Sequence, residues 1–319
     1  MGSSSDRPDV VVVGAGVIGL SCAWRLVERG HTVALWSRDD PADTVSAVAG
    51  AIWYPYLAEP RARVLGWSRA TWRRLAGFAN DPASGVRMCP VIEVFDRAPP
   101  DVWWRDAVPR VEPLAAGDVP PPYAAAIRVD VPVCDVPVHL PWLVAGLARR
   151  GVRLERRSVR DLEEAFAVAD TVVNCTGLGA AALCGDPELR PVRGQVVVVE
   201  AAGPDHAWID DTAATPGYVI PRGRDVVLGG TAQPGDRRLA PDPADTAAIL
   251  AGVARRFPGL ASAPVRAVRV GLRPYRSTVR LELERLAGGR RLVHDYGHGG
   301  SGYTLAWGCA DEVAALVAG

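Results

Sequence analysis

The sequence predicts an α/β protein in which a parallel sheet is interrupted by a second, mainly antiparallel α+β part. An apolar strand at 10–13 leads into Gly14, Gly16 and Gly19 and then into a helix. Gly14 allows a tight turn, Gly16 lets the backbone approach a pyrophosphate, and Gly19 lets the helix pack closely on the strand. The free N–H groups and positive end of that helix favour phosphate. This segment therefore predicts a Rossmann-like dinucleotide site.

A second glycine-rich turn, within 294–304, comes just before a helix expected over 306–318 near the end of the chain. The glycine pattern of the first turn does not distinguish NAD from FAD. A domain that closes over its ligand with both ends of the chain suits a long ligand, and FAD is long enough to need both turns.

Elements of alternating type surround these two turns, as a parallel sheet with crossover helices requires. The first helix shows apolar residues at helical spacing from Val17 to Val27 and ends near Gly30. The apolar strand at 171–175 ends in a small-residue turn, which again presents backbone N–H groups to a ligand. The other expected elements are strands at 32–36 and 152–156 and helices at 141–150 and 162–166.

Two insertions separate these elements. Residues 82–137 are rich in proline, and only 91–95 is a clear strand there. In the second insertion, β-branched runs separated by Gly, Pro and Asp predict a mostly antiparallel sheet, with strands at 196–200, 218–220, 226–229 and 267–271. A hairpin is expected between Arg280 and Arg290. We therefore expect a cofactor domain formed by 1–58, 138–192 and 268–319, and a substrate domain formed by 59–137 and 193–267.

The composition excludes several classes of function. The chain has 36 basic and 36 acidic residues, so nucleic acid and anionic membrane are not expected partners. Every basic residue is an arginine, which excludes Schiff-base chemistry by lysine. No apolar run reaches the roughly 18 residues of a membrane span, and residues 1–8 do not resemble a signal peptide, so a cytoplasmic protein is expected. The cysteines show no metal-binding spacing and are expected to be buried reduced thiols: Cys22, Cys89, Cys134, Cys175, Cys184 and Cys309.

The strand at 32–36 delivers charged residues to the place where a ribose-binding acid usually lies, about 20 residues after the glycines. We expect Asp39 to bind the adenosine ribose, with Arg38 beside it, and Asp40 to be a solvated loop charge.

These motifs and several others, in this order and spacing, resemble the D-amino-acid oxidase family over nearly the whole chain. The segment at 13–21 matches the one that binds the FAD phosphates, and 49–56 matches the one beside the flavin. The other matching segments are Val173-Asn174-Cys175-Thr176-Gly177, Arg193-Gly194-Gln195, Tyr218-Val219-Ile220-Pro221, Gly229-Gly230-Thr231, Gly271-Leu272-Arg273-Pro274 and Tyr296-Gly297-His298-Gly299-Gly300.

The resemblance implies a Rossmann-like FAD-binding domain, built from three separated segments, with an interleaved α+β substrate domain. FAD is expected to be bound non-covalently. The residues assigned to it are Gly14, Ala15, Gly16, Val17, Ile18, Gly19, Arg38, Asp39, Ser46, Gly50, Ala51, Ile52, Val159, Thr176, Gly177, Arg273, Gly299, Gly300, Ser301, Gly302, Tyr303 and Thr304.

The resemblance also implies the catalytic residues. Arg273 matches the arginine that binds the substrate carboxylate, for which a planar guanidinium is suited because it offers two parallel N–H donors. Tyr218 matches a tyrosine that donates to the same carboxylate, and the carbonyl of Gly300 matches the acceptor for the amine. The implied reaction is hydride transfer from Cα of a D-amino acid to flavin N5, with O₂ as the final acceptor and a 2-oxo acid, ammonia and hydrogen peroxide as products. His298 is expected to be a hydrogen-bonded ring near the flavin and not a proton carrier.

Departures from the family pattern bear on specificity. Position 232 is Ala232 and lacks the arginine that D-aspartate oxidases use for a second carboxylate, so neutral apolar D-amino acids are expected to be preferred. Ala214 replaces a lid tyrosine, and a flexible lid is expected to be absent. Tyr54 and Trp208 are candidate pocket walls, with ordinary core packing as the alternative. The rival functions are a D-aspartate oxidase, a glycine or sarcosine oxidase, an NAD dehydrogenase and a non-catalytic FAD-binding module. A homodimer is left open.

Overall fold

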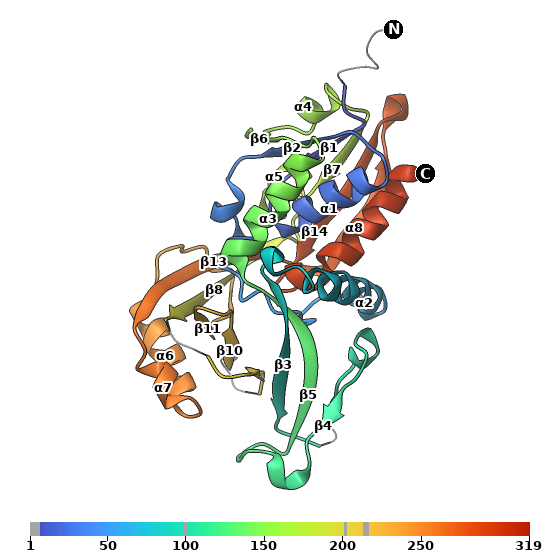
Figure 1. Ribbon diagram of the computed structural model, residues 1–319. Helices are drawn as coiled ribbons and strands as arrows, with labels where there is room; N and C mark the ends of the chain where they lie inside the picture. Colours follow the sequence, from blue (N-terminus) through green and yellow to red (C-terminus); the bar gives the residue numbers. More distant parts are fainter. Residues whose placement is uncertain (1–6, 99–100, 201–202, 213–216) are drawn as a thin grey trace.

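The computed structural model describes residues 7–98, 101–200, 203–212 and 217–319 (Figure 1). Within these residues fourteen strands form one sheet, which divides into a parallel half and a mainly antiparallel half. The first strand of the described chain, β1 (Val10–Val13), and its last helix, α8 (Gly302–Ala318), both belong to the parallel half in Figure 1. No helix of the described chain is long and apolar enough to cross a membrane.

The parallel half carries the predicted dinucleotide-binding pattern. Its strands are, in spatial order, β14 (Arg291–His298), β7 (Thr171–Asn174), β1 (Val10–Val13), β2 (Val33–Ser37) and β6 (Leu154–Arg156). All four valines of β1 are buried, because both faces of this half are covered. Val10 and Val12 belong to the core that includes α1 (Val17–Glu28) and α8 (Gly302–Ala318), whereas Val11 and Val13 face the core around α4 (Glu163–Phe166).

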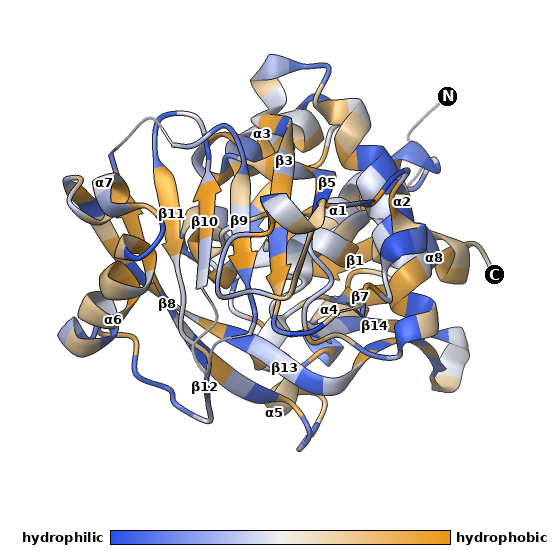
Figure 2. Ribbon diagram, turned by 90° about the horizontal axis from the view of Figure 1, so that it is seen from below, coloured by the Kyte–Doolittle hydropathy of each residue, from blue (hydrophilic) through white to orange (hydrophobic). Residues whose placement is uncertain are grey.

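A single long strand joins the two halves. β13 (Val265–Arg285) pairs with β8 (Arg190–Val199) over its first half and with β14 over its second, with a register shift after Tyr275. In Figure 2 much of β13 has the white or blue colour of residues that are not strongly hydrophobic. Burial of apolar side chains alone therefore does not explain why this strand is so long. Arg273 lies on this strand close to the change of partner, and β13 therefore places it at the boundary between the two halves.

The antiparallel half continues the same sheet beyond β8. Its strands follow in the order β11 (Val226–Gly229), β10 (Gly217–Pro221), β9 (Ala207–Asp210), β3 (Val86–Phe95), β5 (Ala125–Cys134) and β4 (Glu112–Pro113). β9 and β3 are parallel, whereas the other neighbours in this half are antiparallel. β12 (Gln233–Pro234) pairs with β8, and α6 (Pro243–Ala254) and α7 (Pro258–Ala261) pack beside β8, β10 and β11.

The predicted elements are present, with shifted ends. The helix expected from Pro141 begins earlier, as α3 (Val136–Arg149), because Pro137 stands in its first turn, where a missing N–H costs no helical hydrogen bond. α8 also begins earlier than predicted, at Gly302. The strand expected at 91–95 extends back to Val86. The remaining short elements are α5 (Ala180–Leu183) and the 3-10 turns Pro41–Asp43, Val45–Val48, Pro82–Ser84, Arg105–Ala107, Ala116–Asp118, Gly177–Gly179 and Ala287–Gly289.

Helix α2 (Arg61–Phe78) was not predicted, since arginine and glycine interrupt its apolar pattern. Its buried side chains, including Val64, Trp67 and Leu75, join the core of α1 and α8. The segment expected to start the substrate domain therefore packs on the parallel half. The division of the chain into two domains stays a prediction.

The contact of α2 with α8 depends on a glycine. A Cβ built on Gly308 would lie 2.3 Å from the Cα and the carbonyl oxygen of Trp67, so the two helices could not keep their separation. We expect Gly308→Ala to lower the free energy of unfolding by about 1–3 kcal/mol, as overpacking does.

The matched control for this variant is Gly66→Ala on α2, where an added Cβ would meet nothing within 4 Å. At this exposed site alanine should stabilise the protein by about 1 kcal/mol, because it favours the helix. Chemical denaturation of both variants measures the difference. Equal stabilities would contradict the packing argument.

Candidate active site

A long groove lies over the carboxyl ends of the parallel strands, where ligands of such sheets bind. Its volume is about 370 Å³. Its lining runs from the Gly14 turn to residues 270–272 of β13. The predicted cofactor residues that line it are Gly14, Ala15, Gly16, Arg38, Asp39, Val159, Thr176 and Gly177. Ser37, Arg157 and Ser158 also line it and were not singled out from the sequence.

The first glycine turn has the shape that its sequence predicts. Gly14 has a φ of +110°, and a Cβ there would lie 2.3 Å from the carbonyl oxygen of Cys175. A Cβ on Gly19 would lie 1.9 Å from the carbonyl oxygen of Gly14, so only glycine allows the helix to approach the turn. Gly16, the N-cap of α1, provides no side-chain cap. This N-terminus fits the phosphates of a dinucleotide, because its positive end faces a hollow without a large side chain.

Other predicted cofactor residues support the two helix ends without lining a cavity. Ser46 Oγ accepts a hydrogen bond of 3.0 Å from the N–H of Val17. The side-chain hydroxyl of Ser301 accepts a hydrogen bond from the N–H of Tyr56, and that of Thr304 accepts one from the N–H of Tyr54. These bonds tie the segment 54–56 to the start of α8. Some residues of the cofactor prediction line neither this groove nor the second cavity described below. They are Val17, Ile18, Gly19, Ser46, Gly299, Ser301, Gly302 and Thr304.

Asp39 lies where a ribose-binding acid is expected. Its carboxylate lines the groove and pairs with Arg38 at 2.7 Å, and this hydrogen bond lowers the pKa of Asp39. Asp40 lies outside the groove lining and pairs with Arg156 at 2.8 Å.

A second cavity brings the three predicted catalytic residues together. Arg273, Tyr218 and Gly300 all line it. The guanidinium of Arg273 donates a hydrogen bond of 2.8 Å to the carbonyl of Thr231 and lies over Gly194, where a Cβ would be 2.4 Å from Cζ. The remaining predicted residues in this lining are Gly50, Ala51, Ile52, Tyr54, Ala232 and Tyr303.

Glycines also make room for the Tyr218 ring. A Cβ on Gly229 would lie 2.0 Å from Tyr218 Cζ, so the ring lies directly against β11. Burial raises the pKa of Tyr218, although the neighbouring Arg273 acts in the opposite direction. The hydroxyl therefore stays protonated and can donate a hydrogen bond beside the guanidinium.

The linings of the groove and of the second cavity adjoin along two segments of chain. Val45 and Val48 line the groove and residues 49–52 line the cavity, while Leu272 lines the groove and Arg273 the cavity. Arg273 therefore lies one residue from the groove lining along β13. This arrangement fits a long dinucleotide next to a small substrate.

Neighbouring side chains fix β8 beneath Arg273. Arg193, next to Gly194, is fully buried. All five of its N–H donors have acceptors, so its charge is satisfied. The acceptors are the carbonyl oxygens of Arg238 and Ala240 and the side chains of Gln195, Gln233 and Asp245.

An acidic network that the sequence did not predict lies at another part of the cavity. The Tyr54 hydroxyl lies 2.6 Å from Glu93 Oε1 and 3.1 Å from Asp211 Oδ2. Burial and, to a smaller degree, Asp211 raise the pKa of Glu93 to about 8, while the hydrogen bond from Tyr54 opposes the shift. Burial also raises the pKa of Asp211, although part of this residue is exposed. Tyr56, against Gly300, is a further wall residue that the sequence did not single out.

Two other expectations have different outcomes. Trp208 does not line the cavity with Arg273; it packs against Tyr123 and Phe257, which is the core alternative. Ala214, on which the absence of a lid was predicted, lies outside the described residues.

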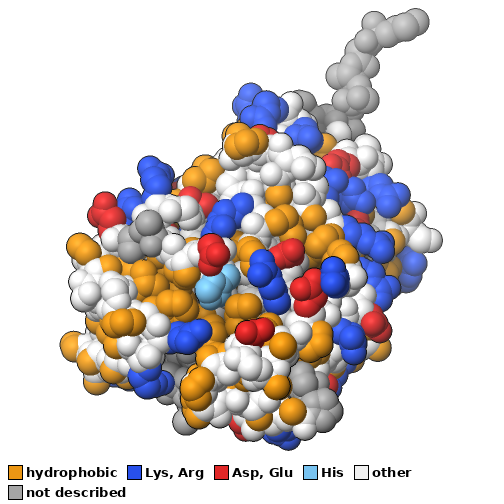
Figure 3. All heavy atoms as spheres, turned by 60° about the horizontal axis from the view of Figure 1, so that its bottom comes forward, with side chains coloured by type: hydrophobic (Ala, Val, Ile, Leu, Met, Phe, Trp, Pro, Cys, Tyr) orange, Lys and Arg blue, Asp and Glu red, His pale blue; other side chains and the backbone are white. Residues whose placement is uncertain are grey.

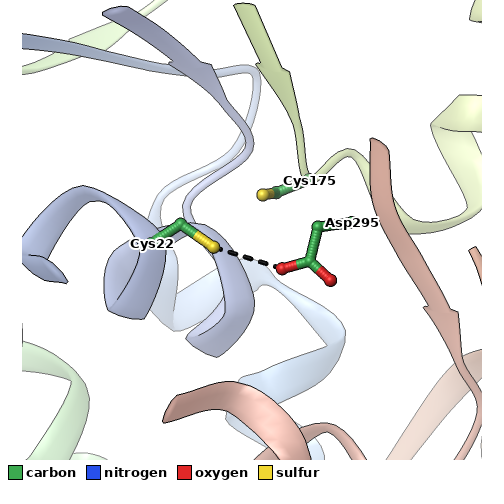
Figure 4. A group of neighbouring side chains, drawn as sticks. All are labelled: Cys22, Cys175 and Asp295. Carbon is green, nitrogen blue, oxygen red and sulfur yellow. Dashed lines mark hydrogen bonds between the residues drawn. The ribbon is translucent and has the colours of Figure 1, made fainter. Parts of the chain in front are cut away.

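A buried cluster lies beneath the Gly14 turn (Figure 4). Cys22 on α1 donates a hydrogen bond of 3.2 Å from Sγ to Asp295 on β14, and Cys175 follows β7 beside them. Burial raises the pKa of Cys22 well above that of a free thiol. His298 lies 3.2 Å from Asp295, is 3% exposed and lines neither cavity. All six cysteines are free thiols, and five of them are buried.

Comparisons with known proteins show the family of this chain. A family model of FAD dependent oxidoreductases, DAO, matches residues 9–316. A D-amino-acid oxidase of Rubrobacter xylanophilus is 46% identical over 308 residues, which cover 96% of this chain and 94% of that protein. The chain belongs to the D-amino-acid oxidase family. Its cofactor is FAD, and the Rossmann-like fold predicted from the sequence is confirmed.

Further relatives define the range of this family. A D-amino-acid oxidase of Streptomyces coelicolor is 44% identical, covering 97% of this chain and 96% of that protein, and the human D-aspartate oxidase is 36% identical, covering 98% and 95%. Among solved structures, glycine oxidase from Geobacillus kaustophilus has a TM-score of 0.84 at 22% identity, covering 98% of this chain and 95% of that one. At this identity the structural match shows the fold alone.

The two neighbouring acids at the end of β2 allow a test of the groove. We expect Asp39→Ala to weaken FAD binding by about 10- to 100-fold, because hydrogen bonds to a charged acceptor would be lost. Asp40→Ala, outside the groove lining, is the matched control and should bind FAD normally. Titration of the apoprotein with FAD measures both affinities. Equal losses in both variants would contradict the role of Asp39.

Glu93 predicts a pH dependence of stability. Its pKa in the folded chain, about 8, lies above the ordinary value of a glutamate. Between these values the folded state holds a proton that the unfolded state lacks, so the free energy of unfolding falls as pH rises from about 4.5 to 8. Glu93→Gln should flatten this decline and stabilise the protein at pH 8. Denaturation of both proteins at several pH values from 5 to 8.5 tests this prediction. If the free energy of unfolding falls equally with pH in both, the raised pKa of Glu93 is contradicted.

Proposed function

We propose that the protein binds a free D-amino acid through Arg273, Tyr218 and Gly300 and oxidises it at Cα. The observation that carries this assignment is the meeting of these three residues in one cavity, whose lining adjoins that of the dinucleotide groove along the chain. The imino acid that forms is hydrolysed to a 2-oxo acid and ammonia. The chemistry supplied by bound FAD is acceptance of a hydride and return of the electrons to O₂, which yields hydrogen peroxide.

The residues of the cavity act mainly by positioning the substrate. The fork of Arg273 can form two parallel bonds to the α-carboxylate, and Tyr218 can donate a third. The Gly300 carbonyl can accept a hydrogen bond from the amine. Fixing these groups leaves one orientation for the Cα–H, which accounts for selection of one enantiomer. Correct orientation of this kind is worth on the order of 7–11 kcal/mol in well-ordered systems.

The groove residues would hold FAD with its phosphates at the glycine turn and its ribose at Asp39. Gly14 and Gly16 leave the necessary space, and the N-terminus of α1 supplies a positive end. Tyr303 and the segment 49–52 line the cavity into which the reactive part of the cofactor would extend.

The cavity walls support a preference for neutral, apolar side chains over D-aspartate. Ile52, Ile209 and Ile220 line the cavity, and Ala232 supplies no cation for a second carboxylate. An unpaired carboxylate in such a site would keep its desolvation cost. The cytoplasmic location and the homodimer stay predictions.

The activity is tested by mixing the FAD-loaded protein without oxygen with D- and L-forms of alanine, valine and methionine, and with glycine, sarcosine and D-aspartate. We expect the flavin absorbance to bleach with neutral D-amino acids and hydrogen peroxide to form when O₂ is admitted. Faster reaction with glycine or sarcosine would favour the amine-oxidase alternative. Absence of bleaching by every compound would contradict the proposal.

The role of Arg273 predicts a large kinetic effect. Arg273→Leu should lower kcat/KM, chiefly by raising KM, because the substrate carboxylate loses its partner. The expected loss of transition-state stabilisation is about 2–5 kcal/mol. FAD should remain bound.

The matched control is Arg285→Leu, at an exposed site of the same strand, which should retain normal kinetics. Steady-state kinetics with D-alanine compares the two variants. Near-normal kinetics of Arg273→Leu would remove this residue from the site.

A further inference from the structure

The substrate cavity carries opposite charges on different parts of its wall. Arg273 supplies a fixed positive charge, and Asp211 supplies a carboxylate on the same lining. Tyr56 and Tyr218 lie within the electrostatic influence of both groups, since Asp211 acts to raise and Arg273 to lower the pKa of each tyrosine. Both charges therefore face one cavity.

Asp211 is held in place but is not neutralised by a cation. The hydroxyl of Tyr54 lies between it and Glu93, which is only 4% exposed. Among the residues that the structure describes, neither Asp211 nor Glu93 forms an ion pair with an arginine or a histidine. Glu93 Oε2 is buried and has no hydrogen-bond partner there. Glu93 is thus a buried carboxyl without a cation, which is unusual, and the more exposed Asp211 carries its carboxyl to the cavity beside it.

The wall around these acids is apolar. Ile52, Ile209 and Ile220 line the same cavity as Asp211, and Ile209 precedes it by two residues. An aliphatic stem can pack against these side chains while its polar end reaches Asp211, as the stems of long cationic side chains do on protein surfaces.

We propose that Asp211, held by Tyr54 and Glu93, is a specificity-determining residue that makes the cavity favour D-amino acids whose side chain ends in a cation. A guanidinium or ammonium group is the chemistry that matches this wall. The proposal rests on the proposed oxidase function and extends its substrate class beyond neutral side chains. It also supplies a repulsive reason for exclusion of D-aspartate, because the same carboxylate opposes a second negative charge.

The test compares D-arginine with D-citrulline, which replaces the charged guanidinium by a neutral group of nearly the same shape. With the FAD-loaded protein we expect kcat/KM for D-arginine to exceed that for D-citrulline by about 10- to 100-fold, chiefly through a lower KM. In Asp211→Asn this ratio should fall to near one, while kcat/KM for D-citrulline stays within about 3-fold of its original value. Glu93→Gln should leave the ratio near its original value at pH 7, because Glu93, with a pKa of about 8, is mostly protonated there and glutamine keeps an acceptor for Tyr54.

Asp118→Asn, an exposed acid outside the cavity, is the control and should leave the ratio unchanged. Equal kcat/KM for the two substrates in the unmodified protein would overturn the proposal, although the oxidase function would stand. An equal loss for both substrates in Asp211→Asn would also overturn it, since Asp211 would then serve the α-amino group common to all substrates. Failure of every D-amino acid to reduce the flavin would instead refute the proposed function.

Discussion

The pairing of β13 with both β8 and β14 is the constraint on which the site depends. Because one strand belongs to both halves of the sheet, the arginine on it is fixed relative to the groove and to the substrate cavity at once. Gly194 on β8 lets the guanidinium lie against the backbone, and the satisfied charge of Arg193 keeps that part of β8 in place. A change that separates β8 from β13 would therefore displace the Arg273 side chain from the cavity without altering Arg273 itself.

The sequence predicted best what depends on neighbouring residues. The strand, glycine turn and helix at 10–28 follow from local geometry, and glycine is required there by contacts of 1.9 and 2.3 Å. Arg273, Tyr218 and Gly300 were identified because each belongs to a distinctive motif, and the structure brings all three to one cavity. Their individual roles stay proposals.

Features that depend on distant contacts were missed. α2 packs its buried face on α8, far along the chain, and its arginine-rich pattern gave no local signal of this contact. Glu93 and Asp211 meet only through Tyr54, and no spacing in the sequence connects a strand acid with a loop acid 118 residues later. For Trp208 the sequence left pocket wall and core packing open, because a strand aromatic can face either side of a sheet and a shift of one residue reverses the choice.

Positive and negative side chains are mixed on the face shown in Figure 3, which limits how far from the protein anionic and cationic amino acids can be distinguished. On the face shown in Figure 3, arginine and acidic side chains lie side by side around the middle, and the chain has no net charge. Their fields cancel over a few ångströms and are screened further by salt, over a Debye length of about 8 Å at physiological ionic strength. Anionic and cationic amino acids should therefore experience little long-range attraction to this face. We therefore expect the protein to distinguish them by the residence time of each bound amino acid in the cavity and not by its rate of encounter.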